Sequence, residues 1–400
     1  MHLLTMPCAS VIMPGKCWLP ERAAFELEPS ENKGGFVQVT KKLKVFRVLS
    51  SLIALLLLAS LALSAGCASS TAPQADKAKG SKPAEVKQES AKTVESKTDD
   101  SKAVTLKAAT AWPKDTMENE PLWMLQKMVE AKSNGNVKIN WTGGPEAIPS
   151  FQLMEALRNG VVDMALTSGA YSVAQVPEAA FHKLSQLTPS EERANGAFDL
   201  FNKVYQEKGN AVLLGRGLHG KKFRLYTNTE VKSSADFKGL RIRVTPIYKA
   251  FVESLGAAAI TIDPGEVYTA LERKVVDGYG WPEARISDYG WQEVTKYAVQ
   301  PPFFVVDVLI LVNKNAWDKL STSQKNLMTD SMKQVEKDSA DWVKGEIDKE
   351  NKLIQEKGVK LVTLSDGDAY VEKAYKAGWE DAIKQAPGNG PKLKELLTKK

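Results

Sequence analysis

Two arginines, Arg241 and Arg243, lie two residues apart in the segment Leu240 to Val244, which alternates apolar and basic residues. This alternation predicts a short strand, and residues two apart on a strand point to the same face. A guanidinium held at the end of a strand is a planar group with paired N–H donors that match the two oxygens of a carboxylate. Such a guanidinium can bind the carboxylate of a ligand, but a structural ion pair at the end of the strand is the alternative for Arg243, and a solvated or structural role is favoured for Arg241.

The segment 239–283 contains the elements that would position these arginines. Its pattern predicts alternating helices and strands, and the last strand brings Tyr279, Gly280 and Trp281 to its carboxyl end. Ligands of open α/β sheets bind at the carboxyl ends of the strands. The expected order after the arginine strand is a helix over Pro246–Leu255, a strand over Ala258–Ile262, a helix over Pro264–Arg273 and a strand that runs into Asp277.

The chain from Val104 onward shows the same alternation, which predicts an α/β fold with a doubly wound parallel sheet. A strand over 161–166 leads into Ser168 and Tyr171. The spacing of Ala156-Leu157 to Val161-Val162-Asp163 repeats in Ala270-Leu271 to Val275-Val276-Asp277, which indicates one copy in each of two lobes. The other expected elements are strands over 104–109 and 137–141 and helices over 119–131, 150–158 and 191–207.

Two lobes and a long helix follow from the second half of the chain. We assign 104–222 to lobe I and 223–306 to lobe II, and expect 307–400 to return to lobe I near Asp307. Residues 321–357 contain no proline and repeat apolar residues at helical spacing. A helix of that length extends roughly 55 Å and is expected to lie across both lobes.

The N-terminal region has the features of an export signal. An apolar run over 52–63 follows four basic residues, so 1–66 is interpreted as a signal region. A signal peptide normally begins near its basic region, yet about forty residues come first here. Because no methionine occurs between Met13 and Met117, we expect translation to start near Val39 through a non-ATG codon, so that residues 1–38 are not made. The sequence before Cys67 resembles a lipobox, with ordinary cleavage near Ala65 as the alternative.

Residues 67–103 are rich in Ser, Lys, Ala and Glu and nearly free of large apolar residues. Such a segment cannot bury enough surface to fold, so it is interpreted as a flexible linker behind a lipid anchor on Cys67.

Composition and motifs argue against several other functions. The net charge of +6 is too modest to indicate nucleic-acid binding. Gly215 to Gly220 matches GxGxxG, but the residues after it favour a strand instead of the helix that a dinucleotide site needs. The sequence contains no HExxH, no GxSxG and no metal-ligand cysteine or histidine spacing. We therefore expect no enzymatic activity, no cofactor and no bound metal.

Three segments taken in order resemble the DctP family, the extracytoplasmic solute-binding proteins of tripartite ATP-independent (TRAP) transporters. They are Ser234–Val244, Glu266–Leu271 and Val276–Pro282, and the resemblance covers roughly 104–390. It implies a two-lobe, type II-like periplasmic-binding-protein fold with a hinge. It also implies that a small organic acid is captured in the cleft and delivered to the membrane permease subunits.

The resemblance also implies roles for individual residues. Arg243 matches the arginine that binds the ligand carboxylate, and Arg224 a second cleft arginine of some members. The remaining matches to the family's binding site are Trp281, Trp112, Ser168 and Tyr171.

One departure concerns metal binding and ligand size. Members that bind 2-oxo acids through a metal carry an acidic residue where this chain has Gly280, which argues against a metal here. Trp281 and Tyr171 suggest a small or flat carboxylate.

Two other functions stay open at this point. The same cleft could serve a receptor that passes its ligand to a sensory system, or, less favoured, a secreted enzyme. An extracytoplasmic location, on a lipid anchor or free in the periplasm, is expected in each case.

Overall fold

The computed structural model describes residues 102–399, which lie within one compact unit of the chain. The predicted signal region 1–66, the lipidation site Cys67 and the linker up to Ser101 lie outside the described residues. Within 102–399, no helix combines the length and the apolarity that a membrane span requires.

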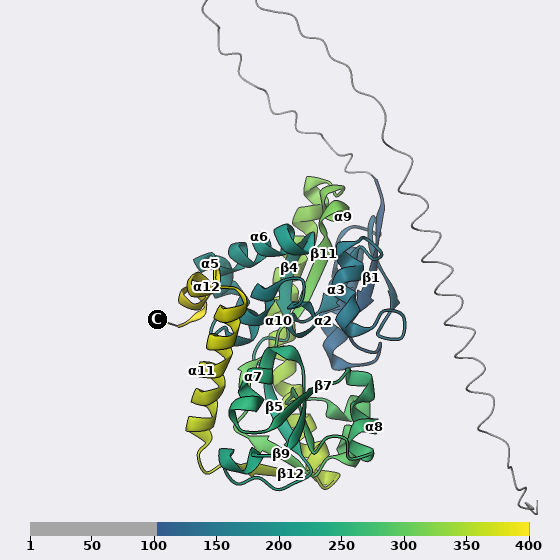
Figure 1. Cartoon of the computed structure of the whole chain (residues 1–400). Coiled ribbons are helices and arrows are strands. Elements are labelled where there is room, and N and C mark those ends of the chain that lie inside the picture. Colours follow the sequence, from purple (N-terminus) through teal and green to yellow (C-terminus); the bar gives the residue numbers. More distant parts are fainter. Residues whose placement is uncertain (1–101, 400) are drawn as a thin grey trace, which may run out of the picture. The chain divides into compact units, whose positions relative to one another are not determined.

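The first sheet, sheet A, has five strands and forms the centre of lobe I (Figure 1). Its first three strands run parallel, and the fourth, from the second half of the chain, is antiparallel to both neighbours. The sheet is therefore mixed, and the prediction of a wholly parallel sheet is wrong. A strand that arrives directly from the other lobe lacks the crossover helix that parallel pairing needs. The strand order is β2 (Val137–Gly143), β1 (Val104–Thr110), β3 (Met164–Thr167), β11 (Val308–Asn313) and β4 (Ala211–Gly217).

The second sheet, sheet B, has seven strands and forms the centre of lobe II. β6, which carries the two arginines, runs parallel to both of its neighbours, β7 and β8. The carboxyl ends of these three strands therefore meet at one edge. The order is β12 (Lys360–Thr363), β9 (Tyr297–Gln300), β5 (Lys222–Thr227), β8 (Gly278–Pro282), β6 (Arg241–Val244) and β7 (Ala258–Thr261), and β10 (Phe303–Val305) also pairs with β5.

The helices largely follow the sequence pattern. The helix expected over 191–207 is interrupted, however, because Gly196 takes a left-handed conformation with φ of 86°, and a residue in that conformation ends a helix. The α-helices are α2 (Glu120–Lys132), α3 (Leu153–Arg158), α4 (Gly169–Ser172), α5 (Pro189–Asn195), α6 (Ala197–Gly209), α7 (Lys249–Ser254), α8 (Val267–Glu272), α9 (Lys314–Asp318), α10 (Thr322–Glu356), α11 (Gly367–Gln385) and α12 (Gly390–Leu397).

Helix α10 connects the two lobes, as the sequence predicted. It has 35 residues and begins at a capping box in which Ser321 and Gln324 satisfy each other's backbone N–H groups. Glu336 binds Arg193 of α5 in lobe I, whereas Glu350 accepts hydrogen bonds from Ser287 in lobe II. At 1.5 Å per residue the helix is about 52 Å long, enough to reach both sheets.

Two short chain segments also join the lobes. Residues 218–221 link β4 to β5, and residues 306–307 link β10 to β11. The segment after 307 contributes β11 to sheet A and β12 to sheet B. These crossovers place the carboxyl end of β3 near residue 307, and they frame the site described next.

Candidate ligand-binding site between the lobes

Arg243 is fully buried at the carboxyl end of β6. Its Nε donates to the carbonyl oxygen of Ile262 at 2.9 Å, and its Nη1 lies 3.3 Å from both the Tyr248 hydroxyl and the Gly280 carbonyl oxygen. The guanidinium also lies over the Trp281 ring, with its carbon 5.5 Å from the ring centroid. Two backbone carbonyl oxygens and one tyrosine hydroxyl, from three neighbouring segments, thus fix the position of this cation.

No carboxylate of the described residues forms an ion pair with Arg243, and its Nη2 has no hydrogen-bond partner there. All of its acceptors are neutral oxygens. A buried charge without a counter-charge is costly, and an anionic ligand is one way to supply the missing charge. Arg241, two residues earlier, instead forms a two-bond ion pair with Asp277 and is partly exposed.

A cavity of about 20 Å³ lies beside this group. A space of this size holds about one water molecule and is smaller than an organic acid. Arg243 does not line the cavity itself, but it contacts two residues that do, Tyr248 and Trp281. The lining residues come from both lobes and are Trp112, Glu118, Ser168, Ala170, Tyr171, Phe223, Thr245, Tyr248, Trp281, Pro282, Val306 and Asp307.

The lobe I wall of the cavity is aromatic. The Trp112 and Tyr171 rings meet edge to face with centroids 5.9 Å apart, and Phe151 packs against the other side of Tyr171 at 5.1 Å. Burial raises the pKa of Tyr171, and the positive charge of Arg243 opposes that shift. The hydroxyl therefore stays protonated and can donate a hydrogen bond.

Ser168 ends β3 and begins α4, and its hydroxyl has two partners. It accepts the N–H of Ala170 at 3.0 Å and donates to Asp307 Oδ1 at 3.0 Å. Asp307 Oδ2 accepts the N–H of Gly169 at 2.7 Å. Burial raises the pKa of the Asp307 carboxyl to about 6.

The lobe II wall contains polar atoms that lack partners. Trp281 Nε1 and Thr245 Oγ1 are buried and have no hydrogen bond with any described residue. Tyr248 donates to the Gly280 carbonyl oxygen at 2.7 Å, and a Cβ at Gly280 would lie 2.5 Å from the Tyr248 ring. Glycine at 280 is thus required by the tyrosine that covers it, and an acidic side chain would not fit there.

Of the six predicted ligand contacts, four line the cavity (Trp112, Ser168, Tyr171 and Trp281), Arg243 lies directly behind it against Tyr248 and Trp281, and Arg224 lies apart. Arg224 is buried, but its Nη1 donates to Asn351 of α10 at 3.0 Å and its Nη2 lies 3.5 Å from Glu283. It does not line the cavity, although its neighbour Phe223 does, since successive side chains on β5 point to opposite faces. The arrangement gives Arg224 a role in attaching α10 to sheet B.

Several lining residues carried no signal in the sequence analysis. Tyr248 follows Arg243 by five residues on a turn of 3₁₀-helix, Pro246–Tyr248. Glu118 forms an ion pair with buried Lys221 at 2.9 Å. A buried tyrosine just after a ligand-binding strand could have been proposed from its position, whereas the ion pair joins residues 103 positions apart and could not.

The lobes also touch beside the cavity. Asp288 of lobe II accepts the backbone N–H of Met117 of lobe I at 2.9 Å and forms an ion pair with Arg285 at 2.8 Å. The Tyr289 hydroxyl lies 3.5 Å from Glu118 Oε2. These contacts hold the two lobes together at the edge of the site.

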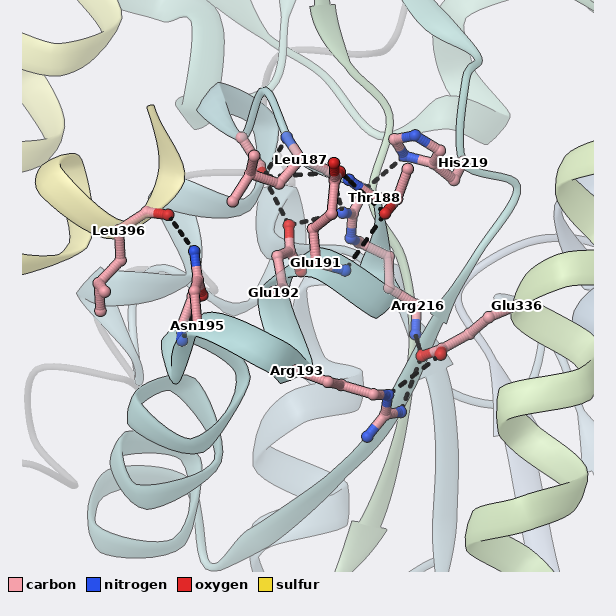
Figure 2. A network of polar contacts seen from close by, with 12 residues as sticks. Leu187, Thr188, Glu191, Glu192, Arg193, Asn195, Arg216, His219, Glu336 and Leu396 are labelled. Atoms are coloured by element: carbon pink, nitrogen blue, oxygen red, sulfur yellow. Dashed lines mark hydrogen bonds and ion pairs between the residues drawn. The ribbon is translucent and has the colours of Figure 1, made fainter. Parts of the chain in front are cut away.

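The GxGxxG segment has a structural explanation. Gly215 lies on β4, and a Cβ there would come within 2.5 Å of Glu336 Oε1. Next to it, Arg216 is buried and binds Glu192 at 2.6 Å, while its own backbone N–H donates to Glu336 (Figure 2). His219 lies 3.4 Å from the same guanidinium. Gly215 permits close packing of α10 and Gly217 close packing against Pro121 of α2, and the segment leads into strand β5 instead of a phosphate-binding helix.

A family model for bacterial extracellular solute-binding proteins, family 7 (DctP), matches residues 108–385. The chain belongs to the DctP family. The match spans most of both lobes and all of α10 and α11, and it includes every residue that lines the cavity.

Among curated proteins, this DctP-family chain is similar to a monocarboxylate 2-oxoacid-binding periplasmic protein of Nostoc, with 26% identity over 54% of this chain and 62% of that protein. It thus spans less than two thirds of that relative. It is also similar to the C4-dicarboxylate-binding periplasmic protein DctP of Rhodobacter capsulatus, with 23% identity over 70% of this chain and 84% of that protein.

The DctP-family fold is also found among solved structures. A TRAP periplasmic solute-binding protein from Desulfovibrio salexigens with bound orotic acid superimposes with a TM-score of 0.67 and 21% identity, over 73% of this chain and 97% of that one. At this identity the likeness shows the fold, namely two α/β lobes with a hinge.

Within the described residues, no group of three or more histidine, cysteine or acidic side chains is arranged to hold a metal ion.

Proposed function

We propose that this DctP-family protein is the extracytoplasmic solute-binding component of a TRAP transporter. It binds one small carboxylic acid between its lobes and delivers the acid to the membrane permease subunits. The observation that carries this proposal is the fully buried Arg243, whose acceptors among the described residues are all neutral.

The proposed contacts follow from the geometry. Arg243 receives the carboxylate of the ligand, and Nη2 supplies a donor that is not otherwise used. Trp281 offers its unpaired Nε1, and Tyr171 offers a protonated hydroxyl. Trp112 packs edge to face against the Tyr171 ring, and Ser168 caps the short helix α4 that carries Tyr171. Relatives that bind 2-oxoacids, C4-dicarboxylates and orotic acid support an acid as the ligand.

Binding requires movement of the lobes. The cavity of about 20 Å³ is too small to admit an organic acid, so the ligand enters when the lobes separate and stabilises the closed state through contacts with both. Residues 218–221 and 306–307 and helix α10 connect the lobes and are the elements that bend. Closure removes water from the ion pair between Arg243 and the ligand, which strengthens that ion pair.

The same proposal includes the location. The family is bacterial and extracellular, and we propose that Cys67 carries the lipid that retains the protein at the membrane, in reach of the permease. Mass spectrometry of the protein purified from membranes tests this, because an unmodified N-terminus near residue 66 would contradict it. We assign the protein no catalytic role.

The experiment that tests the function compares the two arginines of β6. Purified protein is screened by thermal shift against small carboxylic acids, and hits are measured by calorimetry. Arg243→Gln is expected to abolish binding, whereas Arg241→Gln is the matched control and is expected to retain it. Equal affinity of wild type and Arg243→Gln for the same acid would refute the proposed site.

A further inference from the structure

We propose that Asp307 makes the site selective for acids that carry one carboxylate and one cationic nitrogen, as in amino acids and betaines, and makes it reject dicarboxylates. This inference rests on the proposed function. It concerns what the rest of the ligand must look like once Arg243 holds its carboxylate.

Asp307 is the acidic residue of the cavity that has no ion-pair partner among the described residues; the charges of Arg216 and Lys183 act on it from beyond ion-pair distance. It is fully buried, lines the cavity and forms no ion pair with any described residue. Its two oxygens accept one hydrogen bond each, from Ser168 Oγ and from the Gly169 N–H. A carboxylate has about four acceptor sites, so each oxygen can take a further donor. Glu118, the other acid in the cavity wall, is already neutralised by Lys221 at 2.9 Å.

Asp307 and Arg243 reach the site from different lobes. Asp307 accepts hydrogen bonds from Ser168 and Gly169, which follow β3 in lobe I, whereas Arg243 lies at the end of β6 in lobe II. Closing the lobes therefore brings one unpaired cation and one unpaired anion to the same small space. A ligand that matches both has a carboxylate directed to lobe II and a positive group directed to lobe I.

The walls between them favour the same ligand. Trp112, Tyr171 and Trp281 line the cavity, and faces of tryptophan and tyrosine rings attract cations, most strongly where water is excluded. The second carboxylate of a dicarboxylate would instead be buried next to Asp307. Two like charges in a closed site repel each other by several kcal/mol, unless one of them takes up a proton.

The test uses pairs of acids that differ only in the nitrogen. Calorimetry compares L-valine with 3-methylbutanoate, L-proline with cyclopentanecarboxylate and glycine betaine with 3,3-dimethylbutanoate, and includes succinate and malate as dicarboxylates. We expect the nitrogen-bearing member of a pair to bind about tenfold or more tightly, and the dicarboxylates not to bind.

Two variants assign the preference to Asp307. Asp307→Asn keeps the size and removes the charge, and it is expected to abolish the preference for nitrogen. Ser168→Ala removes a neutral partner of Asp307 and keeps the charge, so any loss of affinity that it causes should fall equally on both members of a pair and leave their ratio unchanged. The wild-type comparison stands alone if Asp307→Asn does not fold.

The outcomes separate this inference from the proposed function. If a dicarboxylate or a nitrogen-free acid binds as tightly as its counterpart, and Arg243→Gln abolishes that binding, the function stands and the role of Asp307 is overturned. If none of these acids nor any acid of the wider screen binds, both proposals fail.

Discussion

Arg216 and Arg243 are both buried arginines at the ends of strands, but their surroundings differ. Arg216 on β4 binds the carboxylate of Glu192 at 2.6 Å, and its backbone N–H contacts a second carboxylate, Glu336. Arg243 on β6 contacts only a hydroxyl and two carbonyl oxygens. The first charge is neutralised within the protein, whereas the second has no ion-pair partner among the described residues, as the proposed binding of an anion requires.

The difference teaches how burial and function can be told apart. Burial alone would mark both arginines, and an unusual glycine motif surrounds Arg216. The two arginines differ in whether a carboxylate of the protein lies beside the guanidinium: Arg216 has one, and Arg243, the proposed anion-binding residue, has none among the described residues.

The comparison predicts the largest effect on stability at Arg216. Arg216→Met leaves Glu192 charged and buried without its partner, so we expect a loss of about 3–5 kcal/mol in the free energy of unfolding. Arg243→Met leaves no carboxylate behind and is expected to cost less. Urea unfolding of both variants checks this, and an equal or larger loss for Arg243→Met would break the comparison.

Binding should show the reverse order. Arg243→Gln is expected to weaken acid binding by about 2–5 kcal/mol, because the ligand carboxylate is left unpaired in a closed site. Calorimetry with any acid found in the screen measures it. In a variant of Arg216 that still folds, the affinity should change far less, since Arg216 is paired with Glu192 away from the cavity, whereas Arg243 contacts the lining residues Tyr248 and Trp281.

The pH dependence sharpens the comparison through Asp307. Burial raises the pKa of the Asp307 carboxyl to about 6, and the positive charge of Arg216 opposes that shift. The negative charge of Asp307 in turn favours the protonated forms of two other buried groups, Lys183 and the Tyr205 hydroxyl. Burial lowers the pKa of Lys183 to about 8, so this lysine keeps its charge near pH 6. A cationic ligand group prefers the ionised carboxylate, so affinity should be complete above about pH 6 and fall as the pH decreases through that value.

The expected slope is up to about tenfold in Kd per pH unit below the pKa of Asp307. Calorimetry between pH 5 and 7.5 with an amino acid or betaine that binds measures it. In Asp307→Asn the affinity should be flat over the same window. A wild-type affinity that increases as the pH decreases would contradict the sign.

The smallest effect concerns the contact between the lobes at Asp288. Asp288→Ala removes the acceptor of the Met117 N–H, a contact that the closed lobes make. We expect a loss of about 1 kcal/mol, roughly fivefold in Kd, from a weaker closed state. The faster ligand release should be visible by stopped-flow, and an unchanged Kd and release rate would show that this contact does not contribute to closure.

Local patterns could be predicted from the sequence. The strand around Arg243, the strand that carries Trp281 and the extent of α10 follow from apolar alternation and from the absence of proline over 321–357. The crossing near Asp307 followed from the apolar run over 303–312. The overall family followed from the order of three motifs.

Long-range pairing could not be predicted. The ion pair of Arg241 with Asp277 joins residues 36 positions apart, and the bond of Arg224 to Asn351 joins residues 127 positions apart. The antiparallel direction of β11 likewise depends on where the chain re-enters sheet A. Asp307 was noted only as a crossing point, because nothing local shows that Ser168 and Gly169 would meet its carboxylate.

The point where the described chain begins has a mechanical consequence. The carbonyl oxygen of Lys102 accepts a hydrogen bond of 2.9 Å from Gln324 at the start of α10, and β1 follows directly in sheet A. Any upstream attachment therefore pulls on lobe I and on the near end of the long helix. If Cys67 is lipidated as proposed, lobe I is the lobe held at the membrane. Lobe II, which contains sheet B and Arg243, is then the lobe that moves when the site opens and closes.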